Sequence, residues 1–258
     1  MRLKLTLSCK KGSKIALNNR YELQAVIYSI IEKADSEFSN WLHSQGFGND
    51  RRFKLFSFGW LDAYPYTYKQ GDNFQIATEG KVTWEVSFCV EKIIESFVAG
   101  LFQDTHFNLK AGFLEEVSFR VENVEILQAP VFAETMRYTC VTPILIGKKG
   151  DYDKQEQYLS PLDTGYAELF LHNLRGKVKA AQGDAFIDSE NVTFRLLSSP
   201  DKVRRKPVTV FKKTGKVTHI PYSFDFELAA PVEWQKIGFF AGFGKISSQG
   251  LGMCRVLK

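Results

Sequence analysis

The two halves of this chain carry the same order of strand-like and helix-like segments, which constrains the fold more than any other feature. Apolar and polar residues alternate over residues 3–7, a pattern that predicts a half-buried strand. Residues 23–31 carry apolar side chains at the spacing of one buried helix face. The other elements expected in this half are strands at 53–60, 73–77, 81–90 and 113–128, a helix near 91–103 and a short helix that starts at the cap Asp35.

The second half repeats this rhythm, although residue identity between the halves is low. Each half follows the order strand, helix, two strands, helix, strand, which is the split βαβ order of a ferredoxin-like fold. We therefore predict an α+β protein of two tandem ferredoxin-like domains packed side by side, residues 1–129 and residues 130–258. The elements expected in the second half are strands at 131–141, 143–146, 192–197, 203–211, 217–229 and 253–257, with helices at 161–180 and 231–241.

The composition is that of a globular protein. The chain has 258 residues, 44% of them hydrophobic, and a net charge of +5 that favours an acidic partner without identifying it. No apolar run approaches the ~20 residues of a transmembrane helix, so we expect no membrane partner. The four cysteines lie far apart and form no C-x-x-C pair, which predicts buried thiols in a reducing cytoplasm and no zinc site.

A glycine-rich segment near the C-terminus predicts contact with phosphates. Its two glycine pairs bracket a lysine and two serines, and glycine lets a backbone approach another molecule closely. The segment lacks G-x-G-x-x-G, and Ile246 stands where a P-loop needs Ser or Thr, so a polymeric phosphate backbone is a better ligand than a mononucleotide. A plain glycine-rich strand connection is the alternative. The residues of this predicted cradle are Gly242, Gly244, Lys245, Ser247, Ser248, Gly250 and Gly252.

Positive charge is concentrated in the expected hairpin of the second half. This cluster holds more cations than the net charge of the whole chain, so the mild overall charge conceals a basic patch. Such a hairpin suits contact with nucleic-acid phosphates, while a solvated edge that blocks aggregation is the alternative. The candidate RNA-binding cations are Arg52 in the first half and, in this hairpin, Lys202, Arg204, Arg205, Lys206, Lys212 and Lys213, while Lys216 adds to the positive charge.

Three residues of the first half are candidates for proton transfer and charge stabilisation. Tyr28 and His43 point roughly 130° and roughly 150° from the apolar stripes of their helices, so we expect neither to pack in the core. The dipole at a helix C-terminus favours the imidazolium form of His43, which suits acid–base catalysis. Lys54 is expected on a strand, on the same face as Arg52, where its charge suits phosphate. Ordinary surface positions remain the alternative for all three.

The remaining titratable residues form no metal site that the sequence can define. His106, His172 and His219 have no clustered partner, and the carboxylates are dispersed. A two-metal nuclease needs several convergent carboxylates. Any phosphodiester cleavage by this chain is therefore expected to proceed without metal or other cofactor.

The same residues match a known family. The run GFGKISSQGLGM at 242–253 is similar to a terminal glycine-rich signature, and the runs YEL, IYSII, WLH and FKLFSF within 21–58 look like opening motifs of that family. With these two motifs in order at opposite ends, the chain resembles the CRISPR-associated endoribonucleases that process repeat RNA, members of the repeat-associated RNA-binding superfamily.

The resemblance implies metal-independent cleavage of precursor CRISPR RNA within each repeat. The 2′-hydroxyl would attack the scissile phosphate and give a 2′,3′-cyclic phosphate and a 5′-hydroxyl. Tyr28, His43 and Lys54 correspond to the family's tyrosine, histidine and lysine. His43 would exchange protons with the attacking or leaving oxygen, Lys54 would stabilise the charged phosphorane, and Tyr28 would orient or help deprotonate the 2′-hydroxyl. The roles of Tyr28 and His43 are interchangeable at this point.

The resemblance also defines the partners to be tested. It implies CRISPR repeat RNA as the substrate, and it leaves effector-complex subunits and a homodimer open. Some members of the family bind repeats without cleaving them. A non-cleaving repeat-RNA-binding subunit of a CRISPR effector complex is therefore the alternative function.

Overall fold

The chain folds into two compact units. The computed structural model describes residues 1–49, 51–68, 73–149, 156–212 and 215–257. The first unit consists of Met1–Gly46 and Phe58–Ala129, and the second combines Phe47–Ser57 with Pro130–Lys258. The later boundary lies at Ala129-Pro130, but the earlier segment Phe47–Ser57 belongs with the second unit although the sequence places it in the first half.

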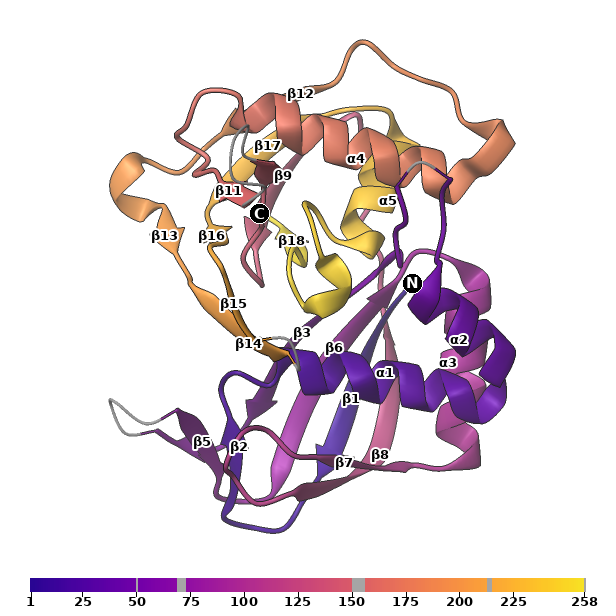
Figure 1. The fold of residues 1–258 in the computed structure, drawn as a ribbon, viewed down its shortest axis with the longest axis vertical. Coiled ribbons are helices and arrows are strands. Elements are labelled where there is room, and N and C mark those ends of the chain that lie inside the picture. Colours follow the sequence, from indigo (N-terminus) through magenta and orange to yellow (C-terminus); the bar gives the residue numbers. More distant parts are fainter. Residues whose placement is uncertain (50, 69–72, 150–155, 213–214, 258) are drawn as a thin grey trace. The chain divides into compact units, whose positions relative to one another are not determined.

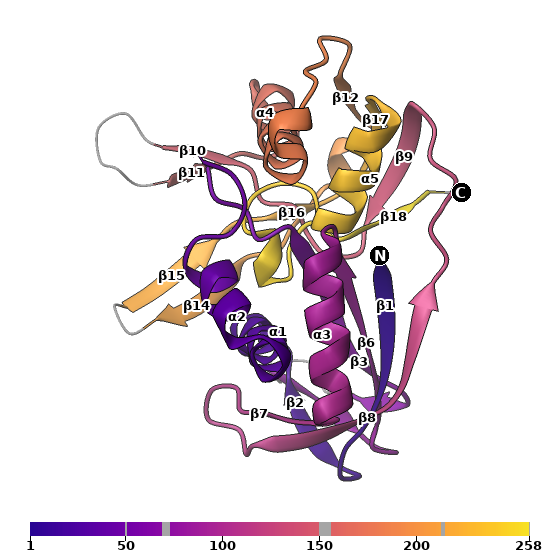
Figure 2. The same ribbon diagram turned by 90° about the vertical axis from the view of Figure 1, so that its right-hand side faces the viewer.

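The first unit is built on a five-stranded sheet with the order β3-β6-β1-β8-β7. Strand β1 runs antiparallel to both β6 and β8 at its centre, and α1, α2 and α3 cover one face of the sheet (Figure 2). A small sheet, β2-β5-β4, adjoins it. The elements are β1 (Arg2–Ser8), β2 (Ser13–Ala16), α1 (Arg20–Ala34), α2 (Ser36–Ser44), β3 (Phe56–Ala63), β4 (Tyr66–Thr67), β5 (Phe74–Ala77), β6 (Lys81–Phe88), α3 (Glu91–Gln103), β7 (His106–Leu109) and β8 (Val117–Leu127).

Helices α1 and α3 pack closely on this sheet. The apolar stripe predicted for α1 is confirmed, because Leu23, Ile27 and Ile31 are all at most 1% exposed. A side chain at Gly100 of α3 would place its Cβ 1.8 Å from the carbonyl oxygen of Ile30. Only glycine therefore lets the backbones of the two helices approach this closely.

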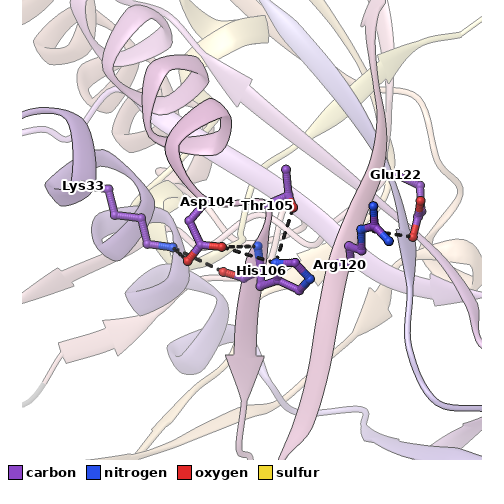
Figure 3. A network of polar contacts seen from close by, with 6 residues as sticks. All are labelled: Lys33, Asp104, Thr105, His106, Arg120 and Glu122. Carbon is purple, nitrogen blue, oxygen red and sulfur yellow. Dashed lines mark hydrogen bonds and ion pairs between the residues drawn. The ribbon is translucent and has the colours of Figure 1, made fainter.

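A polar network fastens the ends of α1 and α3 to β7 (Figure 3). Lys33 of α1 lies 2.7 Å from the carboxylate of Asp104, which follows α3, and also donates to the carbonyl of His106 at 3.3 Å. The other Asp104 oxygen accepts from the backbone N–H of His106 at 2.8 Å. Because these groups hold Asp104 in its charged form, its pKa falls to about 2, with the bond from Lys33 as the largest cause.

The second unit repeats the topology of the first sheet. Its strands have the order β12-β17-β9-β18, and α4 and α5 pack against each other on one face (Figure 1). The sequence correctly predicts both helices and the order in which they alternate with these four strands along the chain. The elements are β9 (Thr135–Cys140), β10 (Gly147–Lys149), β11 (Glu156–Tyr158), α4 (Tyr166–Gln182), η1 (Gly183–Ala185), β12 (Thr193–Leu196), η2 (Pro200–Lys202), β13 (Arg204–Arg205), β14 (Val208–Lys212), β15 (Gly215–His219), β16 (Tyr222–Ser223), β17 (Asp225–Ala229), α5 (Val232–Ala241), η3 (Ser247–Gln249) and β18 (Cys254–Val256).

Aromatic rings fill the core of the second unit. The ring of Phe243, from the glycine-rich segment, stacks on Phe170 of α4 at 5.7 Å and lies 5.3 Å from Phe226 of β17. Tyr138 of β9 lies 5.1 Å from Phe243. These rings attach the C-terminal segment to the helix and to the sheet.

Three strand predictions in the second half need correction. The strand expected at 143–146 is reduced to a single bridge between Ile144 and Tyr222. The strands expected at 203–211 and 217–229 are each interrupted, so that they form β13 and β14 and then β15, β16 and β17. Within the described residues no helix has the length and apolarity needed to cross a bilayer.

Candidate functional site

Helices α1 and α2 meet at a corner that is held by polar contacts. The cap predicted at Asp35 is confirmed, since its carboxylate accepts from the N–H of Phe38 at 2.9 Å and lies 2.8 Å from Lys92 of α3. Buried Ser39 of α2 donates its hydroxyl to the carbonyl of Tyr28 at 2.9 Å. These bonds set the direction of α2 and thereby the position of His43 in its last turn.

This corner brings Tyr28 and His43 together. Their ring centroids lie 4.9 Å apart with an interplanar angle of 85°, an edge-to-face arrangement. His43 is exposed, as its position off the apolar stripe predicts. Tyr28 is only 8% exposed, so the expectation that it avoids the packed interior is wrong. The reason is that α2 covers the side of α1 from which Tyr28 projects.

Burial determines the protonation state of Tyr28. Loss of hydration raises the pKa of its phenol well above the ordinary value, because the phenolate is the form that needs water most. Tyr28 is therefore a neutral hydrogen-bond donor near pH 7.

Lys54 lies in the second unit, on the segment Phe47–Ser57. The backbones of Phe47 and Phe53 exchange two hydrogen bonds of 2.8 Å, which close a loop just before Lys54. Strand β3 starts only at Phe56, because buried Leu55 adopts a left-handed φ of 53° that breaks extended structure. The expectation that Lys54 lies on a strand and shares its face with Arg52 is therefore wrong.

The environment of Lys54 disfavours its charge. The side chain is half-buried, and burial followed by the positive charge of Arg52 lowers the pKa of its ammonium below that of a free lysine. A lysine with a lowered pKa gives up its proton more readily. Positive φ at a non-glycine residue next to it is an uncommon, strained conformation of the kind found at functional sites.

The four glycines of the C-terminal segment all adopt positive φ, between 72° and 81°. A Cβ at Gly252 would lie 1.8 Å from the carbonyl oxygen of Phe243, so no other residue fits there. The N–H group of Phe243 donates to the carbonyl of Gly252 at 2.8 Å. The N–H of Lys245 donates to the carbonyl of Leu145 at 2.8 Å, and that of Gly252 to the carbonyl of Pro143 at 2.9 Å. These three N–H groups hold the segment in its own unit and do not line a phosphate cradle.

Side chains of the same segment are also engaged internally. Lys177 of α4 is 2% exposed and donates its ammonium to the carbonyl of Gly242 and, at 3.1 Å, to the hydroxyl of buried Ser247. Lys245 forms an ion pair with Glu156. The structure therefore describes the segment mainly as a folded part of the second unit, shaped by its glycines.

The basic hairpin predicted from the sequence forms. Strands β14 and β15 pair antiparallel from Val208–His219 to Lys212–Gly215, and β13 pairs with β16 beyond them. The side chains at the start of this region are exposed, namely Lys202, Arg204, Arg205 and Lys206. Lys213 lies outside the described residues, as do the side chains of Lys212 and Lys216.

A basic groove that the sequence reasoning missed lies along α4. It has a volume of about 520 Å³, and its walls carry Arg51 from the loop before Lys54 together with residues from one face of α4. The ring of Phe53 packs on Gly176 and joins the two walls. The spacing i, i+3, i+7 in the expected helix could have revealed this face. The cationic and titratable side chains of α4 in the groove are His172, Arg175 and Lys179.

Carboxylates moderate the charge of this groove. Arg175 lies 2.7 Å from Asp188 and also donates to the carbonyl of Ser189 at 3.1 Å. His172, Lys179 and Arg51 are exposed. In the part of the chain that the structure describes, no three His, Cys, Asp or Glu side chains are grouped as metal ligands.

Comparisons with known proteins cover the whole chain. The family model for the N-terminal part of the CRISPR-associated protein Cas6 matches residues 14–125, and the model for its C-terminal part matches residues 127–256. A CRISPR-associated endoribonuclease Cas6 of Methanocaldococcus jannaschii is 26% identical over 98% of this chain and 91% of its own length. The corresponding protein of Pyrococcus furiosus is 24% identical over 95% of this chain and 85% of its own length.

A solved structure described as a CRISPR associated protein Cas6 shares the fold. It aligns with a TM-score of 0.76 over 100% of this chain and 99% of its own, at 24% sequence identity. The two family models and this likeness agree over both units.

Proposed function

Because this chain belongs to the CRISPR-associated Cas6 family, we propose that it is an endoribonuclease that cleaves precursor CRISPR RNA within its repeats by attack of a 2′-hydroxyl, without metal. The observation that carries the proposal is the Tyr28–His43 ring pair at the α1–α2 corner. It places an exposed imidazole beside a buried neutral phenol at the positions that match the family motifs.

The reaction is a transesterification in which atoms and charge balance. The 2′-oxygen forms a bond to phosphorus and loses its proton, while the bond from phosphorus to the 5′-oxygen breaks. The departing 5′-oxygen takes up a proton. The products are a 2′,3′-cyclic phosphate and a 5′-hydroxyl, and no oxidant, reductant or water is consumed.

His43 is the proposed base. Its exposed imidazole can take the 2′-hydroxyl proton, since neutral imidazole is a base near pH 7. Tyr28 is protonated at that pH because it is buried, so the proposed role for its hydroxyl is to donate a hydrogen bond that orients the reacting group. The burial of Tyr28 thus favours one of the two assignments that the resemblance leaves open.

Lys54 is the proposed stabiliser of the phosphorane. Its ammonium would neutralise charge on the non-bridging oxygens as the 2′-oxygen bonds to phosphorus. Its lowered pKa also makes it a competent proton donor to the departing 5′-oxygen.

Two basic surfaces of the second unit are proposed to bind the RNA backbone. The first is the hairpin region with exposed Lys202, Arg204, Arg205 and Lys206. The second is the α4 groove, whose wall includes Arg51, three residues before Lys54. Phosphate contacts of this kind provide affinity and position the strand. The glycine-rich segment is proposed to support this surface, with Ser248 as a further RNA contact.

The strand orders support the finer description of the fold. In each unit the first strand lies between the third and fourth strands, and the second strand lies beyond the third, with a helix after the first and after the third. This is the arrangement expected of a ferredoxin-like βαββαβ unit. We therefore describe the chain as two tandem ferredoxin-like domains, the first enlarged by α2, β7 and the small β2-β5-β4 sheet.

One cleavage experiment tests the function. The protein is incubated with a CRISPR repeat RNA in EDTA, beside the His43→Ala variant. We expect a product with a 2′,3′-cyclic phosphate from the wild type, and a rate lower by about 10²- to 10⁴-fold from the variant with RNA binding retained. RNA that is bound but intact would favour the alternative, a non-cleaving subunit of a CRISPR effector complex. Metal-dependent cleavage would overturn the proposed chemistry.

A further inference from the structure

A cleft in the first unit gathers aromatic side chains away from the hydrophobic core. It has a volume of about 280 Å³ and lies between β3 and the small β2-β5-β4 sheet, whose strands β2 and β5 are seen side by side in Figure 1. Three of its rings are unusually open to solvent: Trp60 is 37% exposed, Tyr66 is 57% exposed and Tyr68 is 48% exposed. The other lining residues are Ala16, Leu17, Asn19, Leu61, Asp62 and Gln75.

A buried arginine supports the central ring. The guanidinium of Arg20, the first residue of α1, lies 3.8 Å from the ring centroid of Trp60. Arg20 is 3% exposed, and its two terminal nitrogens make no hydrogen bond. Burial lowers its pKa to about 9. The stacked indole is thus the principal partner of a buried cation, which fixes the ring and polarises its π system.

Two amide side chains that line the cleft offer hydrogen-bond acceptors. Asn19 donates its amide NH₂ to the carbonyl of Ala16 at 2.8 Å, and Gln75 donates its own to the carbonyl of Leu61 at 2.6 Å. Each amide is therefore anchored through its nitrogen, which leaves its oxygen as the group that a ligand can use. Asp62 also lines the cleft.

We propose that this cleft, which we call the aromatic cleft, binds an unpaired nucleobase of the RNA substrate by stacking it on Trp60, Tyr66 or Tyr68. Exposed aromatic side chains bind single-stranded bases in this way, because every base has a π face. An indole with an arginine already stacked on it is a preformed platform, so little ordering is lost on binding. The amide oxygens of Asn19 and Gln75 favour a base with an exocyclic amino group, such as adenine or cytosine, over uracil.

The charge of the cleft distinguishes base binding from backbone binding. No lysine or arginine is among the described residues that line the cleft, whereas the hairpin and the α4 groove provide the exposed cations that phosphates need. The aromatic cleft therefore reads a base while the basic surfaces hold the backbone. This inference rests on the proposed RNA substrate, and its test is separate from the cleavage test.

The test measures binding of short labelled RNAs to the His43→Ala protein, which the proposed mechanism leaves able to bind. Single-stranded oligo(A), oligo(C) and oligo(U) are compared by fluorescence anisotropy at fixed salt. Tyr68→Ala and Trp60→Ala are introduced in turn. Phe102→Ala is the matched control, because Phe102 is an 85% exposed ring at the end of α3 that lies outside the cleft.

We expect tighter binding of oligo(A) and oligo(C) than of oligo(U). Tyr68→Ala and Trp60→Ala should each weaken oligo(A) binding by roughly 5- to 150-fold, while Phe102→Ala leaves it unchanged. With His43 intact, Tyr68→Ala should raise the repeat-RNA concentration needed for half-maximal cleavage. Trp60→Phe, which keeps an aromatic face, should restore most of the affinity and shows that the effect is not misfolding.

Two results would overturn the inference. One is an oligo(A) affinity that neither Tyr68→Ala nor Trp60→Ala changes. The cleft would then not bind a nucleobase, and a protein partner would be the remaining occupant. The other is an equal loss from Phe102→Ala, which would show a non-specific effect of removing surface rings. A wild-type protein that fails to cleave repeat RNA but loses oligo(A) binding on Tyr68→Ala would refute the proposed endonuclease and support the aromatic cleft.

Discussion

The rings of Tyr28 and His43 meet edge to face at 4.9 Å, one buried and the other exposed. In this contact the phenol ring of Tyr28 packs against the imidazole and restricts the orientation of the imidazole. It also gives the two residues different chemistry, because burial keeps Tyr28 protonated while His43 remains accessible to a substrate.

Replacement of Tyr28 by Phe separates packing from chemistry. The ring contact with His43 and the burial are retained, so the unfolding free energy should change by less than about 1.5 kcal/mol. Loss of the hydroxyl should lower the single-turnover cleavage rate by about 10- to 100-fold with RNA affinity unchanged, since one oriented hydrogen bond is removed. A rate equal to that of the wild type would show that only the ring matters.

The alkaline limb of the cleavage profile should report on Lys54. Because its pKa is lowered by burial and by Arg52, the rate should begin to fall at a lower pH than the pKa of a free lysine predicts. Arg52→Gln removes the repelling charge, so the pKa of Lys54 should rise and the limb should move to higher pH. Arg120→Gln, an exposed arginine of β8, serves as the control. If the alkaline limb keeps its position in Arg52→Gln, it does not report on the pKa of Lys54.

Gly252→Ala tests the close approach within the glycine-rich segment. The new Cβ would collide with the carbonyl of Phe243, so the protein should lose about 3 kcal/mol or more of unfolding free energy in urea. Gly165→Ala is the matched control in the same unit. Gly165 also has positive φ, 85°, but no atom lies within 4 Å of its added Cβ, so it should cost only about 1 kcal/mol. Equal losses would mean that φ strain, and not the collision, accounts for both.

Salt dependence should identify the phosphate contacts of the basic hairpin. Arg204→Ala and Arg205→Ala should each weaken repeat-RNA binding and reduce the slope of log affinity against log salt by about 1. Lys236→Ala is the comparison, because Lys236 of α5 already pairs with Glu233 at 2.6 Å. An unchanged slope in both arginine variants would favour the alternative, a solvated edge that only prevents aggregation.

The order of the elements could be predicted because buried faces leave periodic traces in the sequence. The alternation in β1 and the stripe of α1 both record burial against a neighbour of the same unit. Tyr28 shows the limit of this reasoning. Its burial comes from a second helix on the other side of α1, which no single-helix pattern contains.

Two features could not be predicted from the sequence, for different reasons: the local backbone at Lys54 and the hydrogen-bond partners of the C-terminal segment. Leucine is compatible with a strand, so nothing in the letters around Leu55 announces a φ of 53°. The glycines at 242–252 correctly suggested unusual backbone. The N–H groups of Gly252 and Lys245, however, bond to the carbonyls of Pro143 and Leu145, which are far away in sequence and leave no local signal.

The segment Phe47–Ser57 is encoded in one half of the protein and packed in the other. Its Phe53 ring rests on Gly176 of α4, and a side chain at Gly48 would collide with the carbonyl of Arg51 and crowd Ala180. If the gene were cut between the codons of Ala129 and Pro130, this segment would be expressed with the N-terminal fragment and not with the unit in which it packs. The C-terminal fragment would expose the α4 surface that Phe53 covers, and it would also lack Lys54. The N-terminal fragment would contain all of the first unit, whereas the C-terminal fragment would lack part of its own folding unit and depends on being expressed as one chain with the first half.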